Sequence, residues 1–262
     1  MQFNDAISAI QALIKQGLST RQSSIISANL RRVELEKEIL YSFNNTIADG
    51  FFKGVRHTGA SYGSLLGPKL LGTYEIEIME DLIHLIKGKS VFIDIGCAEG
   101  YYTTGVAMKS HIPQIIGVDI NYKALNEAKR SAKLNKVIDK CLFTSSMEEA
   151  LKKSKANCLV MIDVDGSERE VIQTFLELAK RQKISDIDFI IETDFNKNGD
   201  SNEAEIKQLL KTNNCTLIKT IAQNPSLRIS RLAKTFTNSF LDAAIIGMEG
   251  RPLNQKWIIA KI

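Results

Sequence analysis

The sequence VFIDIGCAEG, residues 91–100, is a short apolar run followed at once by a turn that contains two glycines. A second apolar run, IIGVDI (residues 115–120), comes after a segment of helical character. Strands that are apolar throughout, rather than at alternate positions, are typical of a parallel sheet that is buried on both faces. This pair of runs therefore predicts the first two strands of such a sheet, joined by a helix.

The same alternation of strand and helix continues to the end of the chain. Five more runs are expected to form strands: CLFTSS (141–146), CLVMIDV (158–164), DFIIETD (188–194), TLIKTIA (216–222) and KWIIAKI (256–262). Because crossovers between parallel strands are right-handed, this order gives a doubly wound sheet. We predict an α/β, Rossmann-like fold with a mostly parallel seven-stranded sheet, whose ligands bind beyond the carboxyl ends of the strands.

Residues 1–72 are expected to form a helical extension ahead of the Rossmann-like domain, which spans residues 73–262. Apolar residues recur at helical spacing in two stretches, the second ending near Ala48. Residues 50–73 contain six glycines and one proline, which indicates a loop. Thr73 then suits the N-cap of the next helix. The extension could support a homodimer, bind the acceptor or cover the core.

Composition limits the partners and the compartment. The chain has 262 residues and a net charge of +4, with no long basic run, which argues neither for nor against nucleic acid. No apolar run approaches the ~20 residues of a membrane helix. The four cysteines form no C-x-x-C pair, and reduced, buried thiols predict a cytoplasmic protein.

The first strand ends at Asp94, and Gly96 and Gly100 follow closely. A glycine after a strand allows a ligand to approach the backbone, and the N–H groups of the next helix can bind an anion. The dinucleotide signature G-x-G-x-x-G is absent, and Asp94 would repel a pyrophosphate but could bind an ammonium group. S-adenosylmethionine carries both an ammonium and a carboxylate. The alternative is a strand–helix turn that binds no ligand.

The second strand ends at Asp119, which Ile120 and Asn121 follow. A carboxylate at this strand end can accept hydrogen bonds from both hydroxyls of a ribose. Asp119 could instead cap the following helix. Nicotinamide dinucleotides also contain a ribose, but the missing middle glycine and Asp94 favour the methyl donor.

Ser145 and Ser146, after the third strand, would lie near an adenine ring in this architecture, or cap a helix. The predicted cofactor-binding residues are Asp94, Gly96, Ala98, Glu99, Gly100, Asp119, Ile120, Asn121, Ser145, Ser146 and Asp163.

Acidic residues gather at the ends of the fourth and fifth strands, namely Asp163, Asp165, Glu168, Glu192 and Asp194. One of them could be the general base for a hydroxyl acceptor, with its pKa raised by acidic neighbours. Several could hold a magnesium or calcium ion, or some could cap helices. We predict Asp163, Asp165 and Asp194 as catalytic candidates and assign no metal, with a divalent ion as the alternative.

The motifs around the first two strands resemble those of class I S-adenosylmethionine-dependent methyltransferases. LVMIDVDGSEREVI (159–172), followed by FIIETD, further resembles the FkbM-type branch, whose fourth strand reads I-D-V-E-G-x-E. Here Asp165 stands where that branch has glutamate, and Asp119-Ile120 stand where many members have glutamate and proline. The resemblance covers about residues 70–200, with GPKLLGTYEIEI and MEGRPLNQKW also similar to parts of a relative of that branch.

This resemblance implies S-adenosylmethionine as the cofactor and methyl transfer, often to an oxygen of a sugar or other small metabolite. Asp163 and Glu168 would lie near the transferred methyl group, and Thr73 and Glu75 in a loop that often covers the cofactor. The Asn-Pro-Pro-aromatic tetrad of amino-methylating enzymes is absent, so we expect a small-molecule acceptor and not nucleic acid. The rival hypotheses are a nicotinamide-dependent oxidoreductase and a non-catalytic binding module.

Overall fold

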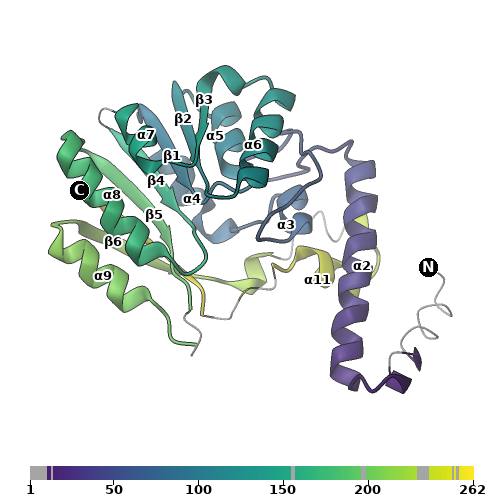
Figure 1. Cartoon of the computed structure of the whole chain (residues 1–262). Helices are drawn as coiled ribbons and strands as arrows, with labels where there is room; N and C mark the ends of the chain where they lie inside the picture. The colour runs from purple at the N-terminus through teal and green to yellow at the C-terminus, as the bar shows by residue number, and fades with distance from the viewer. Residues whose placement is uncertain are drawn as a thin grey trace.

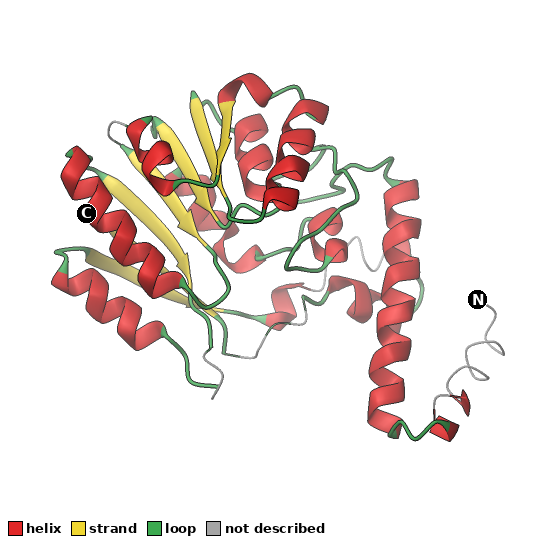
Figure 2. Ribbon diagram, viewed as in Figure 1, coloured by secondary structure: helices red, strands yellow, loops and turns green. Residues whose placement is uncertain are grey.

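The fold is built on a seven-stranded sheet with the strand order β3-β2-β1-β4-β5-β7-β6. Figure 2 shows the strands in yellow with red helices packed around them. The computed structural model describes residues 11–12, 14–154, 157–195, 199–228, 236–249, 251 and 254–262. The strands are β1 Val91–Ile95, β2 Gln114–Val118, β3 Cys141–Thr144, β4 Cys158–Ile162, β5 Ile187–Glu192, β6 Thr216–Ala222 and β7 Lys256–Lys261. The predicted doubly wound, mostly parallel sheet of seven strands is therefore confirmed.

The order of pairing places one crevice at the middle of the sheet. Strand β1 pairs in parallel with β2 on one side and with β4 on the other, so the order in which successive strands join the sheet reverses there. Such a switch point opens a crevice at the carboxyl ends of the two central strands. Strand β7 is antiparallel to both β5 and β6 and lies between them.

Helices cover both faces of the sheet (Figure 1). They are α4 Ile76–Leu85, α5 Tyr101–Lys109, α6 Tyr122–Leu134, α7 Met147–Lys152, α8 Glu168–Gln182 and α9 Glu203–Thr212. Val91, Ile93 and Ile95 of β1 pack with α7, α8 and α9, whereas Phe92 packs with α4 and α5 on the other face. Alternate residues of a strand point to opposite faces, so the continuous apolar run is explained by burial on both.

The extension contributes a helical layer beside the sheet (Figure 1). This layer contains α2 Thr20–Ser42, α3 Leu66–Leu71 and, from the C-terminal part of the chain, α11 Phe240–Gly247. Leu35 and Ile39 of α2 are buried with residues of α3 and α11, and Arg31 forms an ion pair with Asp242. Helix α2 therefore packs with α3 and α11 in a hydrophobic cluster of described residues that contains no strand residue. The domain boundary at residue 72 and a homodimer stay predictions, and residues 1–10 lie outside the described part of the chain.

Three predicted helix boundaries need correction. Helix α2 ends at Ser42 and not near Ala48, because Asn44 and Asn45 take positive φ angles that no helix continues through. The predicted loop 50–73 contains the short helix α3, which Gly72 ends in a left-handed conformation. Helix α4 begins at Ile76 with Glu75 as its N-cap residue, so Thr73 is not the cap. No helix among the described residues is long and apolar enough to cross a membrane.

We expect Gly72→Ala to destabilise the protein more than Gly88→Ala, although both glycines have a φ of +74°. A Cβ atom at Gly72 would overlap the carbonyl oxygen of Asp49, whereas one at Gly88 meets nothing within 4 Å. Both changes place an alanine in the left-handed conformation, which lowers stability, but only Gly72→Ala adds a steric clash. The free energy of unfolding should therefore be lower in Gly72→Ala than in Gly88→Ala by about 2 kcal/mol or more. Urea denaturation of the two variants measures it, and equal losses would contradict the prediction.

Candidate functional site

The crevice is shaped by a close approach of the turn after β1 to the end of β4. Gly96 has a φ of +88°, and a Cβ atom there would overlap the carbonyl oxygen of Asp163. The amides of Gly96 and Cys97 both donate to the carbonyl of Val118 at the end of β2, at 2.8 and 3.1 Å. Three strand ends therefore meet around this one turn, and only glycine fits at its centre.

Asp94 lies buried under the turn. Its Oδ2 accepts hydrogen bonds from the amide and hydroxyl of Thr103, at 3.0 and 2.6 Å, while Oδ1 accepts none from a described residue. Burial raises the pKa of Asp94 to about 7, although the bonds from Thr103 lower it and nearby Asp163 adds to the rise. One carboxylate oxygen thus remains available to a ligand with hydrogen-bond donors.

Asp119 ties the turn to the end of β2. Its Oδ2 accepts from the amide of Ala98 at 2.9 Å, and its Oδ1 accepts from the amide of Asn121 at 2.7 Å. The cap of α6 is Asn121, whose side chain accepts from the amides of Lys123 and Ala124, so capping is not the role of Asp119. Ile120 is 94% exposed. A carboxylate offers about four acceptor positions, so Asp119 can still accept from ribose hydroxyls.

The two predicted serines differ in their surroundings. The side chain of Ser146 accepts from the amide of Glu149 and caps α7, which is the alternative that the sequence left open. Ser145 is exposed just beyond the end of β3. Neither observation shows whether Ser145 or Ser146 contacts an adenine ring, so that role stays a prediction.

The side chain of Glu99 is engaged within the protein. It forms an ion pair with Lys69, and its Oε2 accepts from the amide of Tyr62 at 2.9 Å. Both ionic side chains are 2% exposed, and Lys69 also lies over the rings of Tyr74 and Tyr101, at 4.9 and 5.6 Å from their centres. Burial would raise the pKa of Glu99, but Lys69 and the amide outweigh it and lower the pKa. The pair fastens residues 50–73 to the turn after β1.

Among the predicted catalytic acids and Glu168, most carboxylates accept hydrogen bonds within the nearby loops or are exposed to solvent. Glu168 accepts from the amide of Gly166 and from the side chain of Asn202, and so joins the loops after β4 and β5. Asp194 accepts from the amide of Phe195, and Asp165 is exposed.

Asp163 is different, because it is half-buried and accepts no hydrogen bond from a described residue. Burial and the charge of Glu75 raise the pKa of Asp163 to about 8, against the opposing effect of Arg251. Of the three predicted catalytic residues, Asp163 has the environment expected of a general base.

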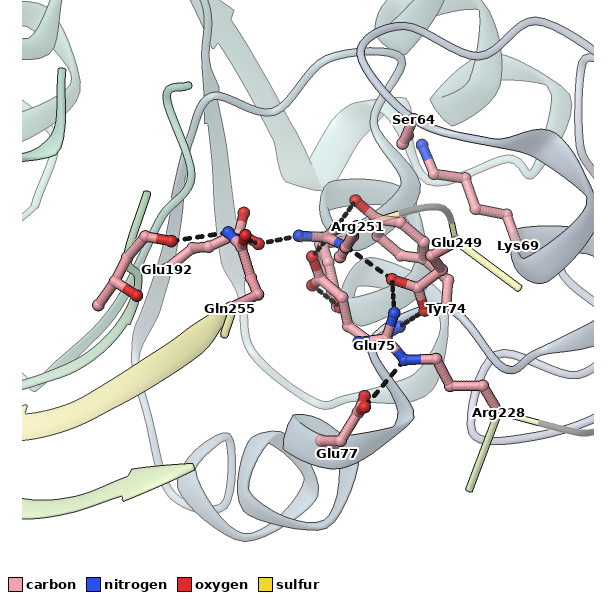
Figure 3. A network of polar contacts seen from close by, with 12 residues as sticks. Ser64, Lys69, Tyr74, Glu75, Glu77, Glu192, Arg228, Glu249, Arg251 and Gln255 are labelled. Atoms are coloured by element: carbon pink, nitrogen blue, oxygen red, sulfur yellow. Dashed lines mark hydrogen bonds and ion pairs between the residues drawn. The ribbon is translucent and has the colours of Figure 1, made fainter. Parts of the chain in front are cut away.

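A half-buried arginine that the sequence did not single out lies among the glutamates of this network (Figure 3) and lowers the pKa of Asp163. Arg251 forms ion pairs with Glu75, Glu192 and Glu249, and it donates to the hydroxyl of Tyr74 at 2.7 Å. Its guanidinium also lies 5.2 Å from the centre of the Tyr74 ring. The segment MEGRPLNQKW was noted in the sequence only for its resemblance, because one arginine carries no periodic signal.

A second arginine extends this network away from the crevice (Figure 3). Arg228 pairs with Glu77 at 2.8 Å and with Glu249 at 3.1 Å. Burial and Glu75 raise the pKa of Glu249 to about 8, although Arg228 lowers it. The network joins the start of α4, the end of β5 and the C-terminal segment.

Three carboxylates at the centre of the network could accept a cation. The ligand atoms of Glu75, Asp163 and Glu192 lie within 4.8 Å of one another. Two of the three already form ion pairs with Arg251, so the protein provides positive charge at this position. The choice between a metal and none stays a prediction.

The comparison with protein families identifies the chain. A family model described as a methyltransferase domain matches residues 86–254, which include the turn, Asp119, Asp163 and Arg251. The chain belongs to this methyltransferase family. The match does not support the FkbM-type branch in particular, and no curated protein matches the sequence.

Several solved structures are similar to this methyltransferase in fold. A ribosomal protein L11 methylase from Lactobacillus delbrueckii has 12% identity and a TM-score of 0.48, and the match covers 79% of this chain and 84% of that one. TYW2 of M. jannaschii, solved with AdoMet, has 13% identity and a TM-score of 0.44, over 71% and 74%. The tRNA methyltransferase TrmK of B. subtilis has 15% identity and a TM-score of 0.44, over 69% and 64%.

These structures correct one prediction. We expected no nucleic-acid partner, from the weak net charge and the missing tetrad, but tRNA methyltransferases are among the similar structures. That expectation was wrong, because charge and one motif describe only some of the ways in which methyltransferases contact an acceptor.

We expect Lys69→Met to lower the free energy of unfolding by about 3–5 kcal/mol, because Glu99 would be left buried without a cation. The double variant Lys69→Met/Glu99→Gln should recover much of this loss. Lys152→Met is a matched control, because Lys152 pairs with Glu148 on an exposed helix surface and should matter little. Urea denaturation measures all three, and equal losses in the two single variants would contradict the buried pair's importance.

We expect Asp163→Asn to stabilise the protein at pH 8.5 and to change its stability little near pH 4. The pKa of Asp163 rises from 3.8 to about 8 on folding, so the folded state binds the extra proton between these values. Rising pH across this range therefore lowers the free energy of unfolding of the wild type by about 1–3 kcal/mol through Asp163. The variant lacks this carboxylate, so its free energy of unfolding should fall less. Parallel pH profiles of the free energy of unfolding would show that Asp163 is not the group responsible.

Proposed function

We propose that this protein is an S-adenosylmethionine-dependent methyltransferase that methylates a hydroxyl group, with Asp163 as the general base. One observation carries the proposal: Asp94 and Asp119 lie at the ends of two adjacent parallel strands and are joined through the Gly96 turn. A cofactor with an amino-acid end and a ribose needs a polar group at each of these two positions. The membership of the methyltransferase family supports the same cofactor.

The residues present fit this cofactor. Asp94 keeps one carboxylate oxygen without a hydrogen-bond partner among the described residues, which suits an ammonium group. Asp119 retains acceptor positions for ribose hydroxyls, and the glycine at residue 96 lets the turn lie directly against the end of β4. The acid at Asp94 disfavours a dinucleotide, as the sequence already indicated.

Methyl transfer to a hydroxyl requires the protein mainly to position the two reactants and to accept the hydroxyl proton. The cofactor supplies an electrophilic methyl group when bound, and the site holds the acceptor oxygen in line with it. Asp163 is the only one of the three predicted catalytic residues that is half-buried and lacks a described hydrogen-bond partner, so it can receive the hydroxyl proton. We further propose a small or sugar-containing acceptor.

The test is transfer of labelled methyl groups from S-adenosylmethionine to small-molecule, RNA and protein fractions of a cell extract. We expect label in the small-molecule fraction. Asp94→Asn should weaken cofactor binding about tenfold or more, through a lost charge-assisted hydrogen bond. Asp163→Asn should lower kcat by about 10²–10⁴ while the cofactor still binds.

Glu170→Gln serves as the control, because Glu170 is an exposed residue of α8. Label found in RNA or protein alone would overturn the proposed acceptor class. Full turnover by Asp163→Asn would exclude this residue as the base, and absence of cofactor binding in the wild type would overturn the proposed activity.

A further inference from the structure

A small cavity separates residues 55–58 from the turn after β1 and the start of α5. Its volume is about 10 Å³, and its lining includes His57, Thr58, Glu99, Gly100 and Thr104. One buried water molecule requires roughly 10–15 Å³ of such space. The cavity is therefore of the size of a single water molecule, and a larger ligand does not fit.

Three polar side-chain atoms in the lining have no hydrogen-bond partner among the described residues. They are Nε2 of His57 and the hydroxyl oxygens of Thr58 and Thr104. His57 and Thr104 are 6% and 1% exposed, and Thr58 is half-buried. Polar groups buried without a partner are costly, and in folded proteins nearly all of them are hydrogen-bonded. Three such atoms around one cavity indicate a partner that they share.

The hydrogen bonding of His57 determines which of its ring nitrogens carries a proton. The amide of Gly59 donates to Nδ1 at 3.0 Å, so Nδ1 is an acceptor. Burial and the charge of Lys69 lower the pKa of His57 to about 4, so the ring is neutral at pH 7. A neutral imidazole has one N–H group, which must then be at Nε2. His57 therefore presents a donor to the cavity and requires an acceptor there.

Hydrogen bonds outside the cavity hold its two walls in place. On one side, the side chain of Asn135 at the end of α6 bonds to both the amide and the carbonyl of Arg56, at 2.8 Å each. On the other side, the amide of Thr104 donates to the carbonyl of Gly100 at 2.8 Å. None of these bonds involves the three polar atoms, so the walls are positioned independently of whatever joins those atoms.

We propose that one ordered water molecule is bound in this cavity, where it accepts a hydrogen bond from Nε2 of His57 and bonds to the hydroxyls of Thr58 and Thr104. Water offers two donors and two acceptors, and each threonine hydroxyl can donate or accept, so all three atoms can be satisfied at once. About three partners are typical of a buried water molecule. A cation does not suit a site into which His57 directs an N–H group, and the carboxylate of Glu99 in the lining opposes an anion.

This water joins residues 50–73 to the turn after β1 at a second point, beside the ion pair of Lys69 and Glu99. The hydroxyl oxygen of Thr104 lies 3.4 Å from the place that a Cβ atom on Gly100 would take, and Gly100 is the N-cap residue of α5. The water site does not depend on the proposed function, because it concerns how the turn is held and not what the turn binds.

A high-resolution crystal structure of the full chain tests the site directly. We expect one ordered water molecule within about 3.2 Å of Nε2 of His57 and of both hydroxyl oxygens. An NMR spectrum of the imidazole nitrogens at pH 7 should show His57 protonated at Nε2, with the signal assigned by its loss in His57→Phe. A cavity without ordered water, or a proton on Nδ1 of His57, would overturn the proposal.

A double-mutant cycle tests the shared partner in solution. Thr104→Val removes a hydroxyl with little change of shape and should lower the melting temperature by about 2–8 °C, because the water loses a partner. His57→Phe removes the donor and fills the cavity with an apolar ring. In that background Thr104→Val should lower the melting temperature by less than half as much, because the water is already displaced.

Thr212→Val is the control, because Thr212 is an exposed residue at the end of α9 and should have the same effect in both backgrounds. Thr58→Val completes the same cycle if Thr104→Val does not fold, which circular dichroism checks. Equal effects of the threonine substitution with and without His57 would show that these side chains share no partner, and would overturn the proposal.

Discussion

The contact between the Gly96 turn and the carbonyl oxygen of Asp163 is the constraint on which the site depends. Two parallel strands end side by side there, and no side chain larger than hydrogen fits between their backbones. Because the amides of the same turn also bond to the end of β2, the positions of Asp94, Asp119 and Asp163 are fixed relative to one another. These backbone contacts hold the turn together with the Asp119 carboxylate, which accepts from the amide of Ala98.

Buried ion pairs then attach distant segments to this rigid centre. Lys69 brings the glycine-rich segment onto the turn through Glu99, and Arg251 brings the C-terminal segment onto α4 and β5. Such pairs are costly to desolvate and contribute little net stability, but breaking one leaves an uncompensated charge. They therefore specify how the segments are placed. They also leave Asp163 among acidic side chains, and burial together with the charge of Glu75 raises its pKa to about 8.

The fold and the strand ends were predictable, whereas the partners of the charged side chains were not. Continuous apolar runs require burial on both faces, so the runs around Ile93 and Ile116 predicted a parallel sheet. The antiparallel position of β7 between β5 and β6 was not predicted, because an apolar run does not reveal its direction. The roles of the predicted cofactor and catalytic residues remain proposals, and the acceptor prediction that excluded nucleic acid was wrong.

The sequence by itself determined the buried strands, the glycine turn and the acids at the strand ends, because each leaves a local pattern of residue types. Only the tertiary structure decided that Lys69 pairs with Glu99 and that Arg251 forms ion pairs with three glutamates. It also decided that the Asp163 carboxylate accepts no hydrogen bond from a described residue. Those outcomes depend on side chains from segments far apart in the chain. The free energy of a charge depends on all the groups around it, and no local pattern records that sum.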